Sequence, residues 1–431
     1  MTSATASTRP PLSAEQIVFW LASLEGAADS FLTLSVGYRL HGRLDVAALR
    51  DAVDRLAAEQ DLLRSRVEHG ATGPVCAPGD PCRLDVRDLR SFPPDEAERR
   101  AQAISMFEST REFPLTSGPF ARFRLLQLAD TEFVLLVTVH HIALDAESVP
   151  VIERRLSAHY RAARTGADVP APVAGYHDYA SEQAALRLTA EAERFWSALL
   201  SRPPLPTLRW PGGAAPAADD APETVHWSEL GGPAWEAARR LAERAGSTMH
   251  TVLLAAFVDA CVTLCGLAPG DEFEVGVPTS MRWDSRWQDV VGPFIHTLPV
   301  RLPAGDGPDV LRRVREVRLR TIDLLDHLQV PLSRLHQSLA GDRTAGRARP
   351  AVAFQYLDGG EHELDLAGVE VAGYPRPRLG VPPFDLSLVV YRTPDVPRIR
   401  IMTNPAAGVT AATATALLAT FEQVLLDGAG S

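Results

Sequence analysis

Two adjacent histidines followed by an aspartate are the residues of this sequence best suited to chemistry. His140 and His141 end a run of strand length, Phe133 to Val139, and Asp145 lies four residues after the second histidine. The run is rich in β-branched and aromatic residues and apolar on both faces, which indicates a buried central strand. Because side chains alternate across a strand, the two histidines are expected to point in opposite directions.

The spacing of these residues is compatible with three kinds of role. A neutral imidazole in a cleft can accept a proton near neutral pH, because its unperturbed pKa is about 6.5. The two histidines and Asp145 could instead bind a metal, but side chains on opposite faces of a strand converge poorly on one ion. Both histidines could also be structural. Asp145 requires a cationic partner if it is buried.

The composition of the chain excludes several functional classes. The 431 residues predict two or three domains at about 150 residues each. The hydrophobic fraction of 46% suffices for large cores, and the net charge of −11 argues against a nucleic-acid partner. All 43 basic residues are arginine. The absence of lysine excludes Schiff-base chemistry and a P-loop lysine.

The cysteines indicate neither a zinc site nor a disulfide framework. They are Cys76, Cys82, Cys261 and Cys265, and they form no CxxC pair. The last two are one helical turn apart in the apolar segment 251–267, so core packing is expected for them.

No targeting or membrane segment is predicted. Residues 1–11 lack the basic and apolar regions of a signal peptide. The most apolar stretch, 252–267, contains Asp259 and is short for a bilayer span. We therefore expect a soluble cytoplasmic protein with no membrane partner.

The clearest linker in the chain is the Gly-, Pro- and Ala-rich segment Gly166 to Gly175. It predicts an N-terminal half of residues 1–170 and a C-terminal half of residues 171–431, each a mixed α/β structure. Ser13 and Asp45 are predicted helix N-caps. Helices are expected at 12–24, 45–60, 96–107, 151–160, 189–200, 235–245, 249–264, 310–325 and 411–426. Strands are expected at 38–44, 63–67, 120–128, 133–139, 273–277, 351–357 and 385–391, with another ending at 301–303. The third and fourth are expected to form a hairpin, and loops are expected at 70–82, 202–222 and 341–350.

A series of short motifs resembles those of the condensation domains of nonribosomal peptide synthetases, over nearly the whole chain. The motifs are Leu12-Ser-Ala-Glu-Gln16 with Phe19-Trp20, Leu63-Arg-Ser-Arg66, His140-His141-x-x-x-Asp145, Tyr176-His-Asp-Tyr179, Gly276 to Arg282 with Val291 to Leu298, His327 to Pro331, and Phe354-Gln-Tyr356. The third corresponds to the family signature HHxxxDG.

The resemblance implies a fold of two halves similar to chloramphenicol acetyltransferase, forming a pseudo-dimer with a central tunnel. It also implies two substrates that enter this tunnel from opposite sides. One is an acyl donor held as a thioester on the phosphopantetheine arm of a carrier protein, and the other is the nucleophile. The chain itself would bind no cofactor and no metal.

The resemblance also implies roles for individual residues. His141 would be the catalytic residue that orients or deprotonates the attacking group, contributing on the order of 10²–10⁴-fold. His140 would be structural, and Asp145 would pair with Arg282 across the halves and shape the site. The residues expected beside the substrates are Ala146, Ser148 and His296.

Three positions depart from the family pattern. Ala146 replaces the glycine of the signature and adds a methyl group where the thioester is expected to pass. His296 replaces the usual asparagine near the acceptor side, which could alter the nucleophile accepted. Gln60 replaces a histidine of the second motif, which we interpret as structural drift. The first two affect the expected substrates more than the class of reaction.

The sequence contains no adenylation motif and no carrier serine motif. We therefore expect a free-standing condensation enzyme of natural-product biosynthesis, which takes its donor from a separate carrier protein. Its acceptor would be a small amine or alcohol, and the sequence does not distinguish amide from ester formation. A monomer is expected, and sedimentation of a stable dimer would refute that expectation.

Other activities of the same fold remain open. Epimerisation domains share HHxxxDG, and coenzyme A-dependent acyltransferases of the wider superfamily make esters without a carrier. An inactive scaffold that recruits carrier proteins is a further alternative, although the retention of His141 and Asp145 argues against it. Heterocyclisation is least expected, because those domains replace the histidines with aspartates.

Overall fold

The chain forms two compact units. The computed structural model describes residues 9–24, 32–71, 73–187, 189–203, 205–211, 224–305, 309–328, 350–357, 364–375, 384–393 and 396–430. Unit 1 comprises Met1–Arg187, Ser280–Ile295 and Glu361–Arg378. Unit 2 comprises Leu188–Thr279, His296–Gly360 and Leu379–Ser431.

This division differs from the contiguous one expected from the linker. Helix α6 (Tyr176–Ala185) belongs to unit 1, and two segments from later in the chain, 280–295 and 361–378, return to that unit. The second of them carries strand β11 (Val369–Tyr374), which pairs with β1 (Thr33–Gly42). Composition can reveal a linker. The return of a later segment to an earlier unit depends instead on pairing between residues far apart in sequence, which leaves no local signal.

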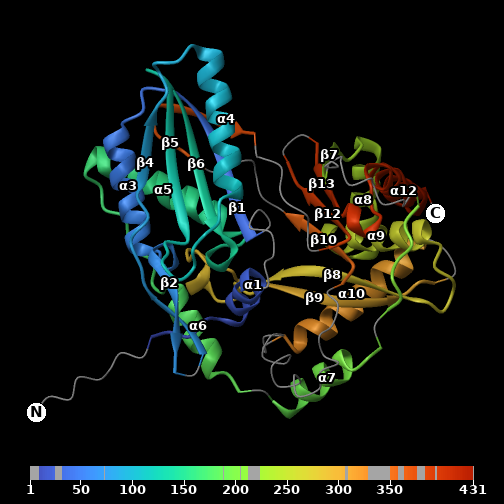
Figure 1. The fold of residues 1–431 in the computed structure, drawn as a ribbon. Coiled ribbons are helices and arrows are strands. Elements are labelled where there is room, and N and C mark those ends of the chain that lie inside the picture. The colour runs from blue at the N-terminus through green and yellow to red at the C-terminus, as the bar shows by residue number, and fades with distance from the viewer. Residues whose placement is uncertain are drawn as a thin grey trace, which may run out of the picture. The chain divides into compact units, whose positions relative to one another are not determined.

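Unit 1 is built on a five-stranded sheet with the order β11-β1-β6-β5-β4 (Figure 1). The remaining strands are β4 (Leu84–Asp88), β5 (Ala121–Ala129) and β6 (Glu132–His140). β6 lies in the middle, antiparallel to β1 and β5, and is buried from Phe133 to His140. The predicted central strand and its hairpin with β5 are therefore confirmed.

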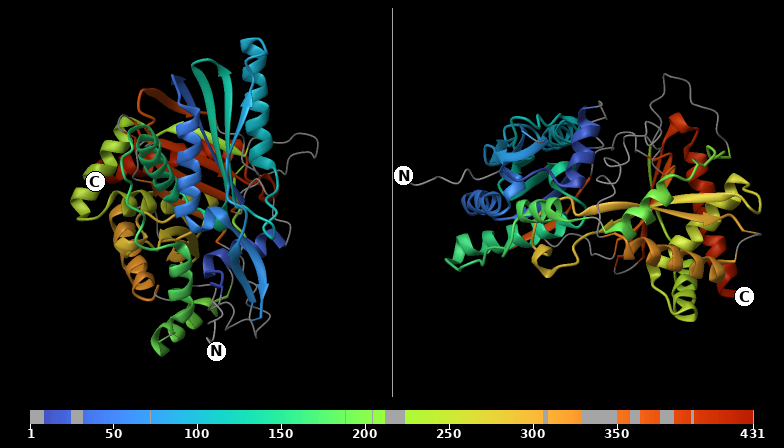
Figure 2. Two further views of the ribbon diagram at one scale, coloured as in Figure 1. Left: turned by 90° about the vertical axis from the view of Figure 1, so that its left-hand side faces the viewer. Right: turned by 90° about the horizontal axis from the view of Figure 1, so that it is seen from below.

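Helices cover both faces of this sheet (Figure 2). α3 (Val46–Glu59) and α5 (Ser148–Thr165) pack together on one face, and α4 (Pro94–Thr110) packs on the other. Leu135 of β6 belongs to the core beneath α3 and α5, whereas Leu136 belongs to the core beneath α4. This alternation explains why β6 is apolar on both faces.

Local signals for helix starts are confirmed in unit 1. Ser13 Oγ accepts a hydrogen bond from the Gln16 amide at 3.2 Å, and Asp45 Oδ1 accepts one from the Ala48 amide at 3.0 Å. The elements not yet named are α1 (Ala14–Leu24), η1 (Asp61–Arg64), β2 (Ser65–Gly70), β3 (Gly73–Pro78), η2 (His141–Ala143) and η3 (Ser285–Trp287).

The prediction of a loop at 70–82 is wrong in part, because residues 73–78 form β3, antiparallel to β2. These two strands form a sheet of their own. Gly and Pro are tolerated in such edge strands, so their presence did not exclude a strand there.

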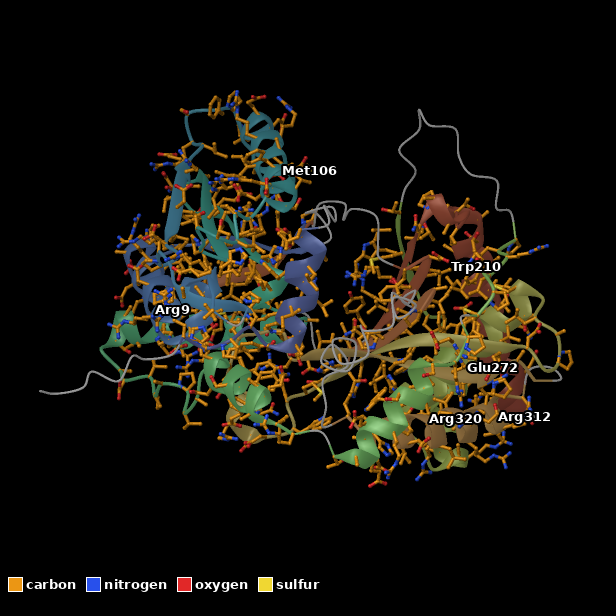
Figure 3. The ribbon with its side chains drawn as sticks, turned by 60° about the horizontal axis from the view of Figure 1, so that its bottom comes forward. Arg9, Met106, Trp210, Glu272, Arg312 and Arg320 are labelled. Atoms are coloured by element: carbon orange, nitrogen blue, oxygen red, sulfur yellow. The ribbon has the colours of Figure 1, made fainter. Side chains whose placement is uncertain are left out.

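Unit 2 contains a six-stranded sheet with the order β7-β13-β12-β10-β8-β9. Its strands are β7 (Val225–Glu229), β8 (Glu272–Ser280), β9 (Ile295–Pro303), β10 (Val352–Leu357), β12 (Leu386–Tyr391) and β13 (Arg398–Thr403). Its helices are α7 (Ala190–Leu200), α8 (Gly232–Ala245), α9 (Met249–Cys265), α10 (Val310–Asp326), η4 (Pro405–Ala407) and α12 (Ala411–Gly430). α8, α9, α10 and α12 pack together, with α9 against β10 and α12 against β13. Figure 3 shows Arg312 and Arg320 on α10 and Glu272 at the start of β8.

The apolar helix α9 is a core element of unit 2. It is buried from Val252 to Cys261, and its Asp259 accepts a hydrogen bond from Arg313 Nε on α10 at 2.7 Å. Across the described ranges, no single helix is long and apolar enough to cross a membrane, and α8 with α9 meets that test only as a pair bent by 112°. Residues 212–222 and 341–349 of the expected loops, and 329–331 of the sixth motif, lie outside the described residues.

Candidate active site

The two histidines lie where β6 ends beside α1. His140 is the last residue of β6, and His141 begins the 3-10 turn η2. His140 caps this turn, because its Nδ1 accepts a hydrogen bond from the Ile142 amide at 3.0 Å. The alternation expected for the two side chains therefore stops at His140, and both imidazoles contact α1, through Ser23 and Phe19.

His140 is buried and neutral. Its Nε2 lies 3.4 Å from Ser23 Oγ, and its ring packs edge-on against Phe113 with centroids 5.9 Å apart. Burial, followed by the influence of His141 and Arg122, lowers the pKa of His140 to about 3. Because Nδ1 accepts a backbone amide hydrogen, the proton of the neutral ring is on Nε2.

His141 carries the opposite tautomer. Its Nδ1 lies 3.2 Å from the carbonyl oxygen of Leu144, and a carbonyl only accepts, so the neutral ring has its proton on Nδ1 and its lone pair on Nε2. Burial lowers the pKa of His141 to about 4, against the opposing effects of the Leu144 hydrogen bond and the Asp145 charge. The ring stacks on Phe19, with centroids 5.2 Å apart and planes 12° apart. Because this pKa lies well below 7, the ring is a neutral nitrogen base at pH 7. The side chain of His141 remains partly exposed.

Asp145 forms a buried ion pair with Arg282. The two residues are only 3% and 7% exposed. Asp145 Oδ1 accepts hydrogen bonds from the Ser148 amide (2.8 Å), the Ser148 hydroxyl (2.6 Å) and Arg282 Nη2 (3.2 Å). Its Oδ2 accepts one from the Phe294 amide (2.9 Å). The predicted contact between Asp145 and a cation at position 282 is present. The expectation that this pair joins the two halves is wrong, because segment 280–295 returns to unit 1 and both residues belong to it.

Arg282 also organises the segment 280–295. Its Nη1 donates to the carbonyl oxygens of Trp287 (2.7 Å) and Val290 (2.6 Å), and its Nη2 lies 3.3 Å from that of Gly292. The guanidinium carbon lies 4.1 Å from the centroid of the Phe294 ring. The charge of Arg282 is therefore used both to neutralise Asp145 and to fold its own segment.

Gln60 has a defined role that sequence reasoning missed. Its Nε2 donates to the carbonyl oxygen of Asp289 at 3.0 Å, and its Oε1 accepts from the Val291 amide at 2.8 Å. A side-chain amide with both a donor and an acceptor thus satisfies two backbone groups of segment 280–295. The residue that replaces the family's histidine therefore has a structural role in unit 1.

Gly292 is required by close packing. A Cβ atom at this position would lie 1.9 Å from Cδ2 of Tyr176, far inside van der Waals contact. The Tyr176 hydroxyl donates to the carbonyl oxygen of Pro293 at 3.0 Å, so the ring cannot easily move away. The fourth and fifth sequence motifs therefore meet at this point.

The three residues expected beside the substrates have different surroundings. Ser148 is fully buried, and its hydroxyl binds Asp145 and accepts from Arg282 Nη2 at 2.7 Å, so a structural role replaces the expected substrate contact. Its spacing of three residues from Asp145 was a signal for this turn. Ala146 is partly exposed between η2 and α5, whereas His296 is buried in β9 of unit 2.

The cysteine thiols are unsuited to nucleophilic catalysis. Burial raises the pKa of Cys76 and of Cys82 to about 12, and a thiol must ionise to be a strong nucleophile. In the part of the chain that the structure describes, no group of three or more His, Cys, Asp or Glu is arranged to hold a metal ion. The imidazole of His141 is therefore the neutral nitrogen base of this site at pH 7.

Comparison with known proteins identifies the family. The family profile described as "Condensation domain" matches residues 7–404. Malpinin synthetase of Mortierella alpina is 29% identical over 84% of this chain, and phosphinothricin tripeptide synthetase PhsB of Streptomyces viridochromogenes is 32% identical over 78% of it. The matches span 5% and 28% of those two proteins. The chain therefore belongs to the condensation-domain family of nonribosomal peptide synthetases.

Solved structures share the fold. The X-domain from teicoplanin biosynthesis has a TM-score of 0.80 and 26% identity, covering 100% of this chain and 97% of that one. The first condensation domain of the calcium-dependent antibiotic synthetase, in complex with a substrate analogue, has a TM-score of 0.77 and 24% identity, covering 98% of each chain. The expected fold class, two halves similar to chloramphenicol acetyltransferase, is confirmed.

Family membership defines the general function. Condensation domains are acyltransferases of secondary metabolism that form amide bonds and work with carrier proteins. These features agree with the predicted class of enzyme and class of partner.

The buried ion pair predicts a difference between two arginines of one segment. Arg282→Ala is expected to lower the free energy of unfolding by about 3 kcal/mol, because it leaves the Asp145 carboxylate buried without its cation. Arg286→Ala is the matched control, since Arg286 is exposed on the same segment and pairs with Glu182 and Asp284. It should cause no measurable loss. Urea unfolding measures both, and equal effects would contradict the structural role of Arg282.

The buried neutral His140 predicts a loss of stability in acid. Its pKa is about 3 in the folded protein and about 6.5 when unfolded, so the unfolded chain takes up the proton first as the pH falls below about 6.5. Between pH 7 and pH 5 the free energy of unfolding should therefore fall by about 2 kcal/mol more in the wild type than in His140→Asn.

The asparagine in this variant retains an acceptor for the Ile142 amide. His41→Asn, which alters an exposed histidine of β1, is the control for the loss of a histidine elsewhere in unit 1. The measurement is urea unfolding at several pH values. The same slope in all three proteins would show that His140 does not titrate as described.

Proposed function

We propose that this condensation domain transfers an acyl or aminoacyl group from the phosphopantetheine thioester of a carrier protein to an amine. The observation that carries the proposal is the state of His141, a neutral imidazole with Nδ1 bound to the Leu144 carbonyl and the lone pair on Nε2. A separate carrier protein is expected to supply the donor, and the arm that bears the thioester belongs to that carrier.

The proposed reaction exchanges a carbon–sulfur bond for a carbon–nitrogen bond. The amine nitrogen attacks the thioester carbonyl carbon, the C–N bond forms, and the C–S bond breaks. The proton lost by the nitrogen is taken up by the departing thiolate. We expect Nε2 of His141 to accept a hydrogen bond from the amine, which directs the lone pair of the amine nitrogen at the carbonyl carbon. The imidazole then passes the proton of the amine to the sulfur.

The environment of His141 favours an amine acceptor over an alcohol. Proton transfer to a base is most efficient when the pKa of the base lies near the working pH, so a base with a pKa of about 4 activates an alcohol weakly. A neutral amine is already nucleophilic and requires mainly alignment and loss of a proton. The proposal is therefore amide formation, with ester formation as an outcome of the assay.

Asp145 and Arg282 support this chemistry without touching the reacting atoms in our proposal. Asp145 is held on both carboxylate oxygens, and it directly follows the Leu144 carbonyl that orients His141. We infer that the ion pair keeps this carbonyl in place, which in turn keeps His141 in one tautomer.

A catalytically idle binding domain is the second candidate. It is favoured by one observation: the X-domain, 26% identical to this chain over its full length, was solved in complex with OxyB. The neutral base at position 141 favours catalysis instead, because a binding domain has no need of it.

His141 provides the principal test. Wild type and His141→Ala are incubated with aminoacyl thioesters on a carrier protein, as pantetheine mimics and as coenzyme A thioesters, together with a panel of amines and alcohols. Mass spectrometry should show an amide whose rate falls on the order of 10²–10⁴-fold in the variant. His41→Ala, at an exposed histidine of β1, is the control and should retain full activity.

Each other outcome of this assay identifies an alternative. An ester would assign an alcohol acceptor, and turnover only with coenzyme A thioesters would assign the wider acyltransferase superfamily. Deuterium uptake at the α-carbon without transfer would assign an epimerase. An unchanged amide yield in His141→Ala would refute the role of His141. Binding of a partner protein similar to OxyB, without any turnover, would assign the idle binding domain.

The low pKa of His141 also predicts the shape of the pH–rate profile. The free base is the active form, and it is lost only as the pH falls through about 4. The value of kcat/KM, after correction for the fraction of unprotonated amine, should therefore be flat between pH 5.5 and 7.5. An acid limb centred near pH 6.5 would indicate an ordinary, solvated histidine instead.

Ala146 is proposed to restrict the donor. It directly follows Asp145 and is partly exposed, so its methyl group occupies space that a glycine would leave open. Ala146→Gly is expected to raise kcat/KM for bulky acyl groups relative to an acetyl donor. The ratio of the two values measures this effect, and an unchanged ratio would exclude contact between Ala146 and the donor.

His296 is proposed to influence the acceptor. The resemblance implies that asparagine is usual at this position. We therefore choose His296→Asn, which replaces an imidazole ring by a smaller amide. It is expected to change the ranking of amines in the same panel while leaving the ranking of donors unchanged. A change in donor ranking alone would contradict this assignment.

A further inference from the structure

One face of α1 contacts the histidine turn at three points. Gln16, Phe19 and Ser23 are three and four residues apart, which places them on the same face of the helix. Gln16 Nε2 donates to the carbonyl oxygen of Ile142 at 3.1 Å, and Ser23 Oγ lies 3.4 Å from His140 Nε2. Between these two contacts, Phe19 stacks on the second imidazole of the pair.

The peptide groups of Ile142 are held on both sides by this arrangement. Its amide donates to His140 Nδ1, and its carbonyl accepts from Gln16. The turn η2 that contains Ile142 leads directly to Leu144, whose carbonyl binds His141 Nδ1. The orientation of the second imidazole therefore depends on a turn that is tied to α1.

The hydrogen bonds through Ser23 run in a single direction. His140 Nδ1 is an acceptor, so its Nε2 must be the donor toward Ser23. The Ser23 hydroxyl donates its own hydrogen to the carbonyl oxygen of Phe19 at 3.0 Å, which leaves its oxygen to accept. The other tautomer of His140 would place donor against donor at the Ile142 amide. Its Nε2 would then accept from Ser23 only if the hydroxyl gave up its hydrogen bond to the Phe19 carbonyl.

We propose that Gln16, Phe19 and Ser23 are positioning residues that hold the His141 ring stacked on Phe19 and in its Nδ1-protonated form. His140 is the link between α1 and the turn. The proposal rests on the proposed function of His141, but it concerns residues outside the reacting atoms. It also explains why the first residue of the pair is a histidine, since one rigid neutral ring offers an acceptor at Nδ1 and a donor at Nε2.

The tautomers are measured directly by NMR, without any substrate. Protein labelled with ¹⁵N at the histidine rings gives separate signals for protonated and unprotonated ring nitrogens, and His140→Gln and His141→Gln assign them. In the wild type we expect a proton on Nε2 of His140 and on Nδ1 of His141. Ser23→Ala leaves Nε2–H of His140 without its acceptor. We expect the turn η2 to shift as a result, which weakens the Ile142 and Leu144 hydrogen bonds that fix the two rings and makes both rings mixtures of tautomers.

Activity provides a second readout on the same variants. Ser23→Ala should lower kcat about tenfold with KM changed less than twofold, as expected for the loss of one partly buried hydrogen bond that acts on the catalytic step. Ser23→Thr retains the hydroxyl and should restore both tautomers and kcat. Phe19→Leu retains apolar packing but removes the flat ring, and it should lower kcat in the same way.

Ser181→Ala is the matched control. The Ser181 hydroxyl donates to the carbonyl four residues earlier, that of His177, at 2.7 Å, as Ser23 does to Phe19, but Ser181 is exposed on α6. This variant loses the same kind of helix contact and should leave the tautomers and kcat unchanged. Thermal unfolding verifies that each variant is folded.

Two results would overturn the proposal. One is a proton on Nε2 of His141 in the wild type. The other is wild-type tautomers and kcat in both folded variants, Ser23→Ala and Phe19→Leu. A wild type that makes no amide would instead refute the proposed function, and the NMR tautomers would still decide the role of α1.

Discussion

The buried ion pair between Asp145 and Arg282 is the interaction on which the site of unit 1 depends. Two charges removed from water are tolerated only when each finds enough hydrogen-bonding partners. Asp145 obtains them from Ser148, Phe294 and Arg282, and Arg282 obtains the rest from backbone carbonyls of its own segment. Satisfying this one pair therefore attaches segment 280–295 to the loop that follows His141.

Burial and hydrogen-bonding partners also determine the states of the two histidines. Each ring is kept neutral by burial, and each has one nitrogen committed to a backbone group, Nδ1 to an amide hydrogen in His140 and Nδ1 to a carbonyl in His141. Adjacent residues of one type thus acquire opposite tautomers and different roles. A base kept neutral in this way is weak, which suits a nucleophile that needs orientation more than deprotonation.

Sequence patterns predicted those features that one local rule controls. The run before His140 identified a central strand, and Ser13 and Asp45 identified helix starts, because burial pattern and capping depend on residues close in sequence. The family resemblance placed Arg282 beside Asp145. The pattern did not predict the structural role of Ser148 or the contacts of Gln60, because both depend on partners in segment 280–295. It also failed at β3 and β11, where pairing decides the structure.

The sequence by itself determined the class of fold, the family and the identity of the residues that could do chemistry. Only the tertiary structure decided that segments 280–295 and 361–378 belong to unit 1, that Ser148 is structural, and that α1 contacts both histidines. The tautomer and the pKa of His141 belong to this second group as well. They depend on burial and on the Leu144 carbonyl, and residue type alone specifies neither, because both arise from groups brought together by folding.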